Sequence, residues 1–274
     1  MPTLNKIFAV IDPTTDKQSA LTSAMRIVAE NKAIVLHAYA AIQSSGTNTD
    51  PAALQRVETA RHLAWIESLV APVRAAGNEV KVEVEWTTDW RSAIVRAANS
   101  ANADLVIKAA GSHSGAGRRV LQTSDWALLR QAHCPVYLIK KGTIESGANV
   151  LVAIDIARKD DLHSKLNERV LEFGRALVDS IPNSNLYAVN AYESSEKFVS
   201  PSDLAHKAGI IRTHAHTVDG TPEKVIAAIA ELVKADIVVI GTAARDGLKA
   251  AVIGNTAEKI LDAIASNLLT VNTR

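Results

Sequence analysis

The residues best suited to chemistry lie in one glycine-containing stretch near the end of the chain, Gly241–Thr256. It follows Ile237–Ile240, a short apolar run typical of a strand covered on both faces. Asn255 and Thr256 are predicted N-caps of a helix through Ala257–Ile264. Where a loop joins a parallel strand to a helix N-terminus, backbone N–H groups point outward and can bind an anion. The stretch therefore has the form of a phosphate-binding loop.

Two other places carry reactive side chains. His214 and His216 are two apart on a predicted strand, so both could face one metal ion, but no third ligand is evident nearby. A partly covered strand face is the favoured interpretation. Cys134 follows His133, which could activate the thiol, although a reduced, buried cysteine is favoured. Neither a local Ser–His–Asp spacing nor a GxSxG sequence indicates a nucleophilic enzyme.

The composition excludes several classes of protein. With 274 residues, 47% of them hydrophobic and 22% charged, the chain is long enough for two soluble domains. No apolar run approaches the ~20 residues of a membrane helix, and the N-terminus lacks a secretory pattern. A single cysteine excludes an internal disulfide, and a net charge of +1 gives no nucleic-acid signal. We expect a cytoplasmic protein with no membrane or nucleic-acid partner.

Strands and helices are predicted to alternate along the chain, which favours parallel sheets with helices on both faces. The predicted strands of the first half are Ile7–Ile11, Ile34–Tyr39, Val80–Trp86, a strand directly after Asp104, and Pro135–Lys140. The predicted helices between them are Ser19–Glu30, Pro51–Ala76 and Trp90–Ala101, the last capped by Asp89.

The same pattern then starts again, which indicates an internal duplication. The first strand and its terminal Asp12 return as Val150–Ile154 with Asp155. Later in each half the alignment has no gap, and Asp104 falls on Asp236, 132 residues further on. We predict a first domain over residues 1–142, a polar linker over 143–148 and a second domain over 149–274.

The two halves differ in length between their second and third strands. Tyr39 and Trp86 are 47 positions apart, whereas Tyr192 and Val218 are 26 apart. The long helix of the first half therefore has no full counterpart, and Ser202–Ala208 leaves room for about two turns. One face of the second sheet is predicted to be thinly covered.

Over nearly its whole length the chain resembles the universal stress protein family in its tandem, E-type form. The resemblance implies two five-stranded parallel α/β sheets flanked by helices, a fold like that of the adenine nucleotide alpha hydrolases. ATP-binding members carry the pattern G-x2-G-x9-G-S/T after the fourth strand. Gly241 and Gly254 have its overall spacing, and the segment AAVIGNTAEKILD is especially similar to the second E-type domain.

The resemblance also implies an adenine-nucleotide site in the second half, with Mg²⁺ only as the companion of ATP. Asp155 matches an acidic residue near adenine in the family. Two positions depart from the pattern, because Ala244 replaces the second glycine and Asn255 replaces the Ser/Thr, with Thr256 one place later. The implied binding residues are Asp155, Ala191, Gly241, Thr242, Ala244, Arg245, Gly254, Asn255 and Thr256.

The aligned loop of the first half has lost the motif. Ala109, Ser112 and Gln122 stand where the three glycines would be. Nucleotide binding is therefore expected in the second half only.

The expected function is that of a cytoplasmic stress-response binding protein without turnover. Its domains would pair as a tandem pseudo-dimer through their fifth strands, Val136–Lys140 against Leu268–Val271, because apolar edges need cover. Two alternatives stay open. One is slow ATP hydrolysis or phosphate transfer at the same loop, which no general base or Walker-type lysine supports. The other is a nucleotide-free scaffold for a small molecule, a lipid or a protein. Whether the chain also forms a homodimer is open.

Overall fold

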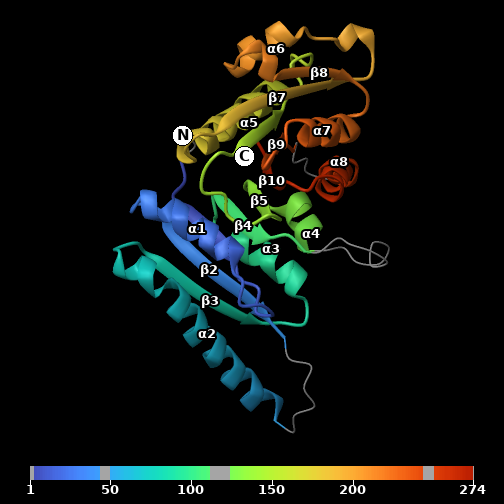
Figure 1. The fold of residues 1–274 in the computed structure, drawn as a ribbon. Coiled ribbons are helices and arrows are strands. Elements are labelled where there is room, and N and C mark those ends of the chain that lie inside the picture. The colour runs from blue at the N-terminus through green and yellow to red at the C-terminus, as the bar shows by residue number, and fades with distance from the viewer. Residues whose placement is uncertain (1–2, 44–49, 112–123, 243–249, 274) are drawn as a thin grey trace. The chain divides into compact units, whose positions relative to one another are not determined.

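The computed structural model describes residues 3–43, 50–111, 124–242 and 250–273. The chain divides into two compact units, one formed by Leu4–Gly142 and the other containing Thr143–Arg274. Figure 1 traces the alternating strands and helices of each unit. These two units are the first half and the second half of the protein.

The first half is a parallel sheet in the strand order β3-β2-β1-β4-β5. Its described elements are β1 (Lys6–Val10), α1 (Ser19–Glu30), β2 (Val35–Ile42), α2 (Pro51–Ala75), β3 (Val80–Trp86), α3 (Trp90–Ser100), β4 (Leu105–Ala109), α4 (Ser124–Gln131) and β5 (Val136–Ile139).

The second half is a parallel sheet of matching order, β8-β7-β6-β9-β10. Its described elements are β6 (Asn149–Ala153), α5 (Asp161–Ser180), β7 (Asn185–Tyr192), η2 (Ser195–Lys197), α6 (Pro201–Ala208), η3 (Arg212–His214), β8 (Ala215–Asp219), α7 (Pro222–Leu232), β9 (Ile237–Gly241), α8 (Ala250–Ala263) and β10 (Asn267–Val271). The predicted fold class, two parallel α/β sheets flanked by helices, is confirmed.

The duplication extends to individual hydrogen bonds. Asp104 and Asp236 each accept a backbone N–H from the start of their half's first strand, at Lys6 and Asn149. The aspartate two residues after each first strand is held by a buried amide side chain, which bonds to both its N–H and its carbonyl. Gln18 holds Asp12 in this way and Asn167 holds Asp155. These clamps fix the first strand–helix loop of both halves.

The apolar runs form the core, as their patterns predict. In β1 the side chains of Ile7, Phe8 and Ala9 are fully buried, so both faces of this strand are covered. Asp89 accepts the N–H of Ser92, which confirms its prediction as the cap of α3. Helices lie on the two faces of each sheet because successive parallel crossovers are right-handed and the strand order reverses at β1 and at β6.

The second helix is where the halves differ most. α2 has 25 residues and α6 has 8, which confirms the predicted shortening. α6 begins at a Ser200 cap and ends at Gly209, whose φ of 69° closes the helix in the left-handed region. α2 is long enough to pass beyond its contacts with the core, since its first fully buried residue is Ile66. The two termini of α2 therefore have different environments.

Two local predictions are wrong. α8 begins at Ala250, so Asn255 and Thr256 lie inside the helix and are not its N-caps. Ala250 and Ala251 favour helix strongly enough to carry it past Gly254, at a cost of about 1 kcal/mol for the glycine. His214 belongs to η3 and β8 starts at the next residue, so the histidine pair does not lie on one strand.

Candidate functional site

A cavity of about 650 Å³ lies at the carboxyl ends of β6, β7 and β9 in the second half. The sheet order reverses at β6, because β7 pairs on one side of it and β9 on the other. Ligands of open α/β sheets bind in the crevice at such a switch point. The fold therefore places this cavity where a parallel sheet is best able to hold a ligand.

The floor of the cavity is apolar. Leu166 and Val170 from α5, Ile240 from β9, and Ala257 and Ile260 from α8 contribute to it. A planar heterocycle or another apolar group fits such a lining, because its burial removes apolar surface from water.

Polar groups line the rim. The guanidinium Nε of Arg158 lies 3.3 Å from Asp155 Oδ2, and its Nη1 lies 3.0 Å from His163 Nε2. His163 Nδ1 lies 2.8 Å from Asp160, so the imidazole donates to that carboxylate and presents Nε2 to the arginine. This bond from His163 is the main reason why the pKa of Asp160 is lowered. Asp155 and Arg158 are both exposed enough to exchange these contacts for contacts to a ligand.

Gly241 is needed for a reason that the motif alone does not reveal. A Cβ at this position would lie 2.5 Å from Leu166 Cγ, closer than real carbon atoms approach. Since φ at Gly241 is not positive, close packing against α5 is what favours glycine here, rather than backbone conformation. Directly after β9, the backbone N–H of Thr242 donates to the Val271 carbonyl of β10 at 2.7 Å, which extends the pairing of these two strands.

Five of the nine predicted binding residues line this one cavity: Asp155, Ala191, Gly241, Thr242 and Thr256. Ala244 and Arg245 lie outside the described residues. Gly254 and Asn255 lie within α8.

Three polar residues of the cavity wall, Arg158, His163 and Asn167, were not predicted from the sequence. The signals that could have found them are the short spacing from Asp155 to Arg158 and the matching amide residues, Gln18 and Asn167, after each first strand.

The same place in the first half is filled by the protein itself. Lys108 Nζ lies 2.8 Å from Asp125 Oδ1, and Asp125 Oδ2 accepts the N–H of Gly111 at 2.8 Å. Asp125 is only 1% exposed and Lys108 13%. At the offset of 132 residues these two positions correspond to Ala257 and Ile240, which line the cavity in the second half. Ser112 and Gln122, two positions of the lost motif, lie outside the described residues.

The other candidate side chains, His214, His216 and Cys134, are poorly suited to catalysis or metal binding. The Tyr187 ring stacks on His214 with centroids 4.2 Å apart and lies 6.5 Å from His216, so both imidazoles pack against an aromatic side chain. Among the described residues, no group of three His, Cys, Asp or Glu side chains is placed to hold a metal. Burial raises the pKa of Cys134 to about 12, which agrees with a reduced, unreactive thiol. No described helix is long and apolar enough to cross a bilayer.

Fold and cavity together define a tandem α/β protein with an open switch-point site in its second half. The sequence pattern of the universal stress protein family matches residues 3–140 and 148–272, so the chain belongs to that family.

Comparison with individual proteins agrees with this assignment. The chain is 28% identical to universal stress protein E of Escherichia coli (strain K12) over 299 aligned positions, which cover 99% of this chain and 95% of that protein. It is 27% identical to the universal stress protein E homolog of Haemophilus influenzae, covering 96% of each. The crystal structure of a putative universal stress protein from Pseudomonas aeruginosa UCBPP-PA14 superposes with a TM-score of 0.80 at 25% identity, over 98% of this chain and 93% of that one.

Proposed function

We propose that this chain is a cytoplasmic stress-response binding protein whose second half binds an adenine nucleotide, with ATP and its Mg²⁺ as the favoured ligand. The observation that supports the proposal is the cavity at the ends of β6, β7 and β9. Its lining brings Asp155, Gly241 and Thr256 together, although they are up to 101 positions apart in the sequence.

The chemistry of the lining fits the parts of a nucleotide. The apolar floor around Ile240 and Ala257 suits the adenine ring. The Asp155 carboxylate can accept hydrogen bonds from ribose hydroxyls, and Arg158, released from Asp155, can pair with a phosphate. Among the described lining residues, both ring nitrogens of His163 are already engaged, by Arg158 and by Asp160, so we propose binding without turnover.

The ligand contacts can be tested with a variant and its duplicate. Asp155→Ala is expected to weaken ATP binding to the full-length protein by about tenfold, the effect of one lost charge-assisted hydrogen bond. Asp12→Ala removes the matching residue of the first half and is expected to leave the affinity unchanged. Isothermal titration with MgATP measures both.

Each negative outcome has a meaning. If ATP does not bind at millimolar concentration and mass spectrometry of the purified protein finds no nucleotide, the nucleotide-free scaffold replaces this proposal. Release of phosphate with turnover would instead favour the enzyme.

We also propose that the two halves pair through their fifth strands, β5 and β10, as a tandem pseudo-dimer. Both strands are apolar edges of their own sheets, and such edges need cover. In the full-length protein the amides of both strands are expected to exchange slowly with deuterium. Rapid exchange along either edge would contradict the pairing.

A further inference from the structure

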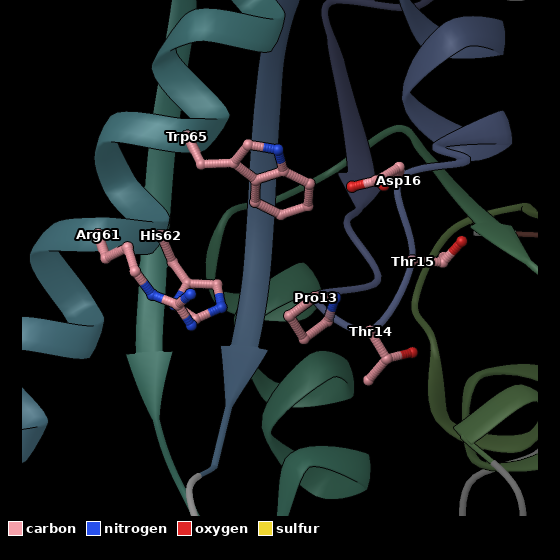
Figure 2. Close-up of a pocket in the computed structure, with 7 residues that line it drawn as sticks. All are labelled: Pro13, Thr14, Thr15, Asp16, Arg61, His62 and Trp65. Atoms are coloured by element: carbon pink, nitrogen blue, oxygen red, sulfur yellow. The ribbon is translucent and has the colours of Figure 1, made fainter.

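A second cavity, of about 620 Å³, lies in the first half between the loop after β1 and the helix α2. Figure 2 shows Arg61, His62 and Trp65 on α2 pointing toward Pro13, Thr14 and Asp16 on the loop. In the described residues of the second half the corresponding helix, α6, has 8 residues where α2 has 25, so it forms no equivalent wall. This cavity is therefore a product of the asymmetry between the halves.

The loop side of the cavity is built by its own hydrogen bonds. Asp12 Oδ1 accepts from both the backbone N–H and the hydroxyl of Thr14, at 2.9 and 2.6 Å. The buried Gln18 amide donates to the carbonyls of Asp12 and Thr15. A loop fixed in this way presents its side chains in one arrangement, which lowers the entropic cost of binding.

The helix side supplies an aromatic face and a ring nitrogen. His62 Nδ1 lies 2.8 Å from the Glu58 carbonyl, which can only accept, so the proton of the neutral ring is on Nδ1 and Nε2 is an acceptor. The imidazole meets the Trp65 ring edge-on, with centroids 6.2 Å apart, which holds both rings in place. Trp65 is half-buried and lines the cavity.

Donors and acceptors are mixed around this cavity. Thr15 Oγ1 accepts from the Lys17 N–H, so its own proton can be donated. The Asp16 carboxylate and His62 Nε2 accept, and Arg61 donates. Arg61 is already paired with Glu58 at 2.6 Å, and Asp16 adds a negative charge, so the cavity has no excess positive charge to hold a phosphate.

We propose that this cavity binds a small, uncharged, polyhydroxylated ring compound, of the size of a monosaccharide, which stacks on Trp65. Hydroxyl groups both donate and accept, so they match the mixed lining better than an anion or a purely apolar ring. The C–H face of such a ring suits the negative π face of an indole. Two sources share this chemistry, a free sugar and the ribose of a nucleoside.

All four tryptophans, Trp65, Trp86, Trp90 and Trp126, lie in the first half, so their signals report on that half. Full-length protein labelled with 5-fluorotryptophan is titrated with glucose, ribose, adenosine and inorganic phosphate while ¹⁹F resonances are recorded. The Ile240→Lys/Ala257→Asp variant serves as a background in which the second-half cavity is closed. The loss of one resonance in Trp65→Phe assigns the signal of that ring.

A sugar at tens of millimolar is expected to shift the Trp65 resonance and leave that of Trp90 unchanged. Trp65→Ala should weaken binding at least about tenfold, and Asp16→Asn by several-fold, whereas Trp90→Phe and Arg56→Gln should have no effect. Binding of adenosine with the same dependence on Trp65 supports the site and assigns the nucleoside as its source.

Three results would overturn the proposal. They are a response to phosphate alone, no response of Trp65 to any of the four compounds, and sugar binding that survives Trp65→Ala. Circular dichroism of each variant establishes that it is folded. Because the test is made with the second-half cavity closed, its outcome does not depend on nucleotide binding there.

Discussion

The carboxyl ends of the fourth strands, β4 and β9, show how two copies of one fold can differ at the same place. In the first half the buried pair of Lys108 and Asp125 fills this place and takes up the Gly111 N–H. In the second half the matching residues, Ile240 and Ala257, leave a cavity. The Asp125 carboxylate on α4 thus accepts the Gly111 N–H, which could otherwise donate to an anionic ligand. In the first half the internal carboxylate of Asp125 occupies a backbone N–H at the start of the loop in which the glycines are also replaced.

At the second helix of each half, it is the first half that has a cavity. The long α2 builds a cavity against the β1–α1 loop, whereas α6 is too short to do so. In the part of the chain that the structure describes, the two halves therefore have their cavities at different places, one at the ends of β6, β7 and β9 and the other beside α2.

Removing Asp125 should have the largest effect. Asp125→Ala leaves the Lys108 ammonium buried without its carboxylate, which is expected to cost about 3–5 kcal/mol. Urea unfolding followed by tryptophan fluorescence measures this, since every tryptophan lies in the first half.

The double variant Lys108→Ile/Asp125→Ala copies the second half and is its matched control. It removes both charges together and should recover most of the loss. A single variant as stable as the wild type would show that the pair is not what fills this site.

Transferring the pair should close the open cavity. Ile240→Lys with Ala257→Asp places a lysine and a carboxylate at the floor, and it is expected to weaken ATP binding by more than about tenfold. The Lys108→Ile/Asp125→Ala variant should keep the wild-type affinity in the same titration. Equal affinity in all three proteins would place the nucleotide elsewhere.

Variants at Gly241 and at its counterpart Ala109 distinguish the effect of close packing on stability from the effect of backbone conformational freedom. Gly241→Ala is expected to lose about 1–3 kcal/mol, because the added methyl overlaps Leu166, and it should also narrow the cavity. Ala109→Gly is the control and should cost only about 0.5–1 kcal/mol, as for a glycine in a strand. Thermal unfolding followed by circular dichroism compares them, and equal losses would contradict the packing argument.

The smallest expected effect concerns pH. Burial, above all, lowers the pKa of His37 from its ordinary value of 6.5, despite its contact with Glu83 at 3.0 Å. The unfolded chain then binds the proton more readily, so the stability of the first half should fall as pH drops below about 6.5.

The corresponding position of the second half is Asn190, so His37→Asn is the matched variant. It should reduce this pH dependence in urea unfolding at pH 7.5 and pH 5.5. An unchanged dependence would assign the effect to other groups.

The fold could be predicted from the sequence because its causes are local. Apolar runs such as Ile237–Ile240 and caps such as Asp89 determine strands and helix ends without tertiary information. The α8 start was missed because two alanines outweighed a glycine, an energy difference of about 1 kcal/mol that a motif does not reveal.

The site could be predicted only in part. Asp155, Gly241 and Thr256 follow from the family pattern, and they line one cavity. The partner of Lys108 could not be predicted, because Asp125 lies 17 residues further on and only the folded sheet brings the two charges together. The Trp65 cavity was missed for the same reason, since its two walls are about 50 residues apart.

The difference between the halves can be measured as the stoichiometry of MgATP binding to the full-length wild-type protein by isothermal titration. We expect one nucleotide per chain, bound in the second half, and no measurable binding after Ile240→Lys/Ala257→Asp. Two nucleotides per chain, or one that remains bound in that double variant, would contradict the claim that the Lys108–Asp125 pair closes the first half and that its absence opens the second.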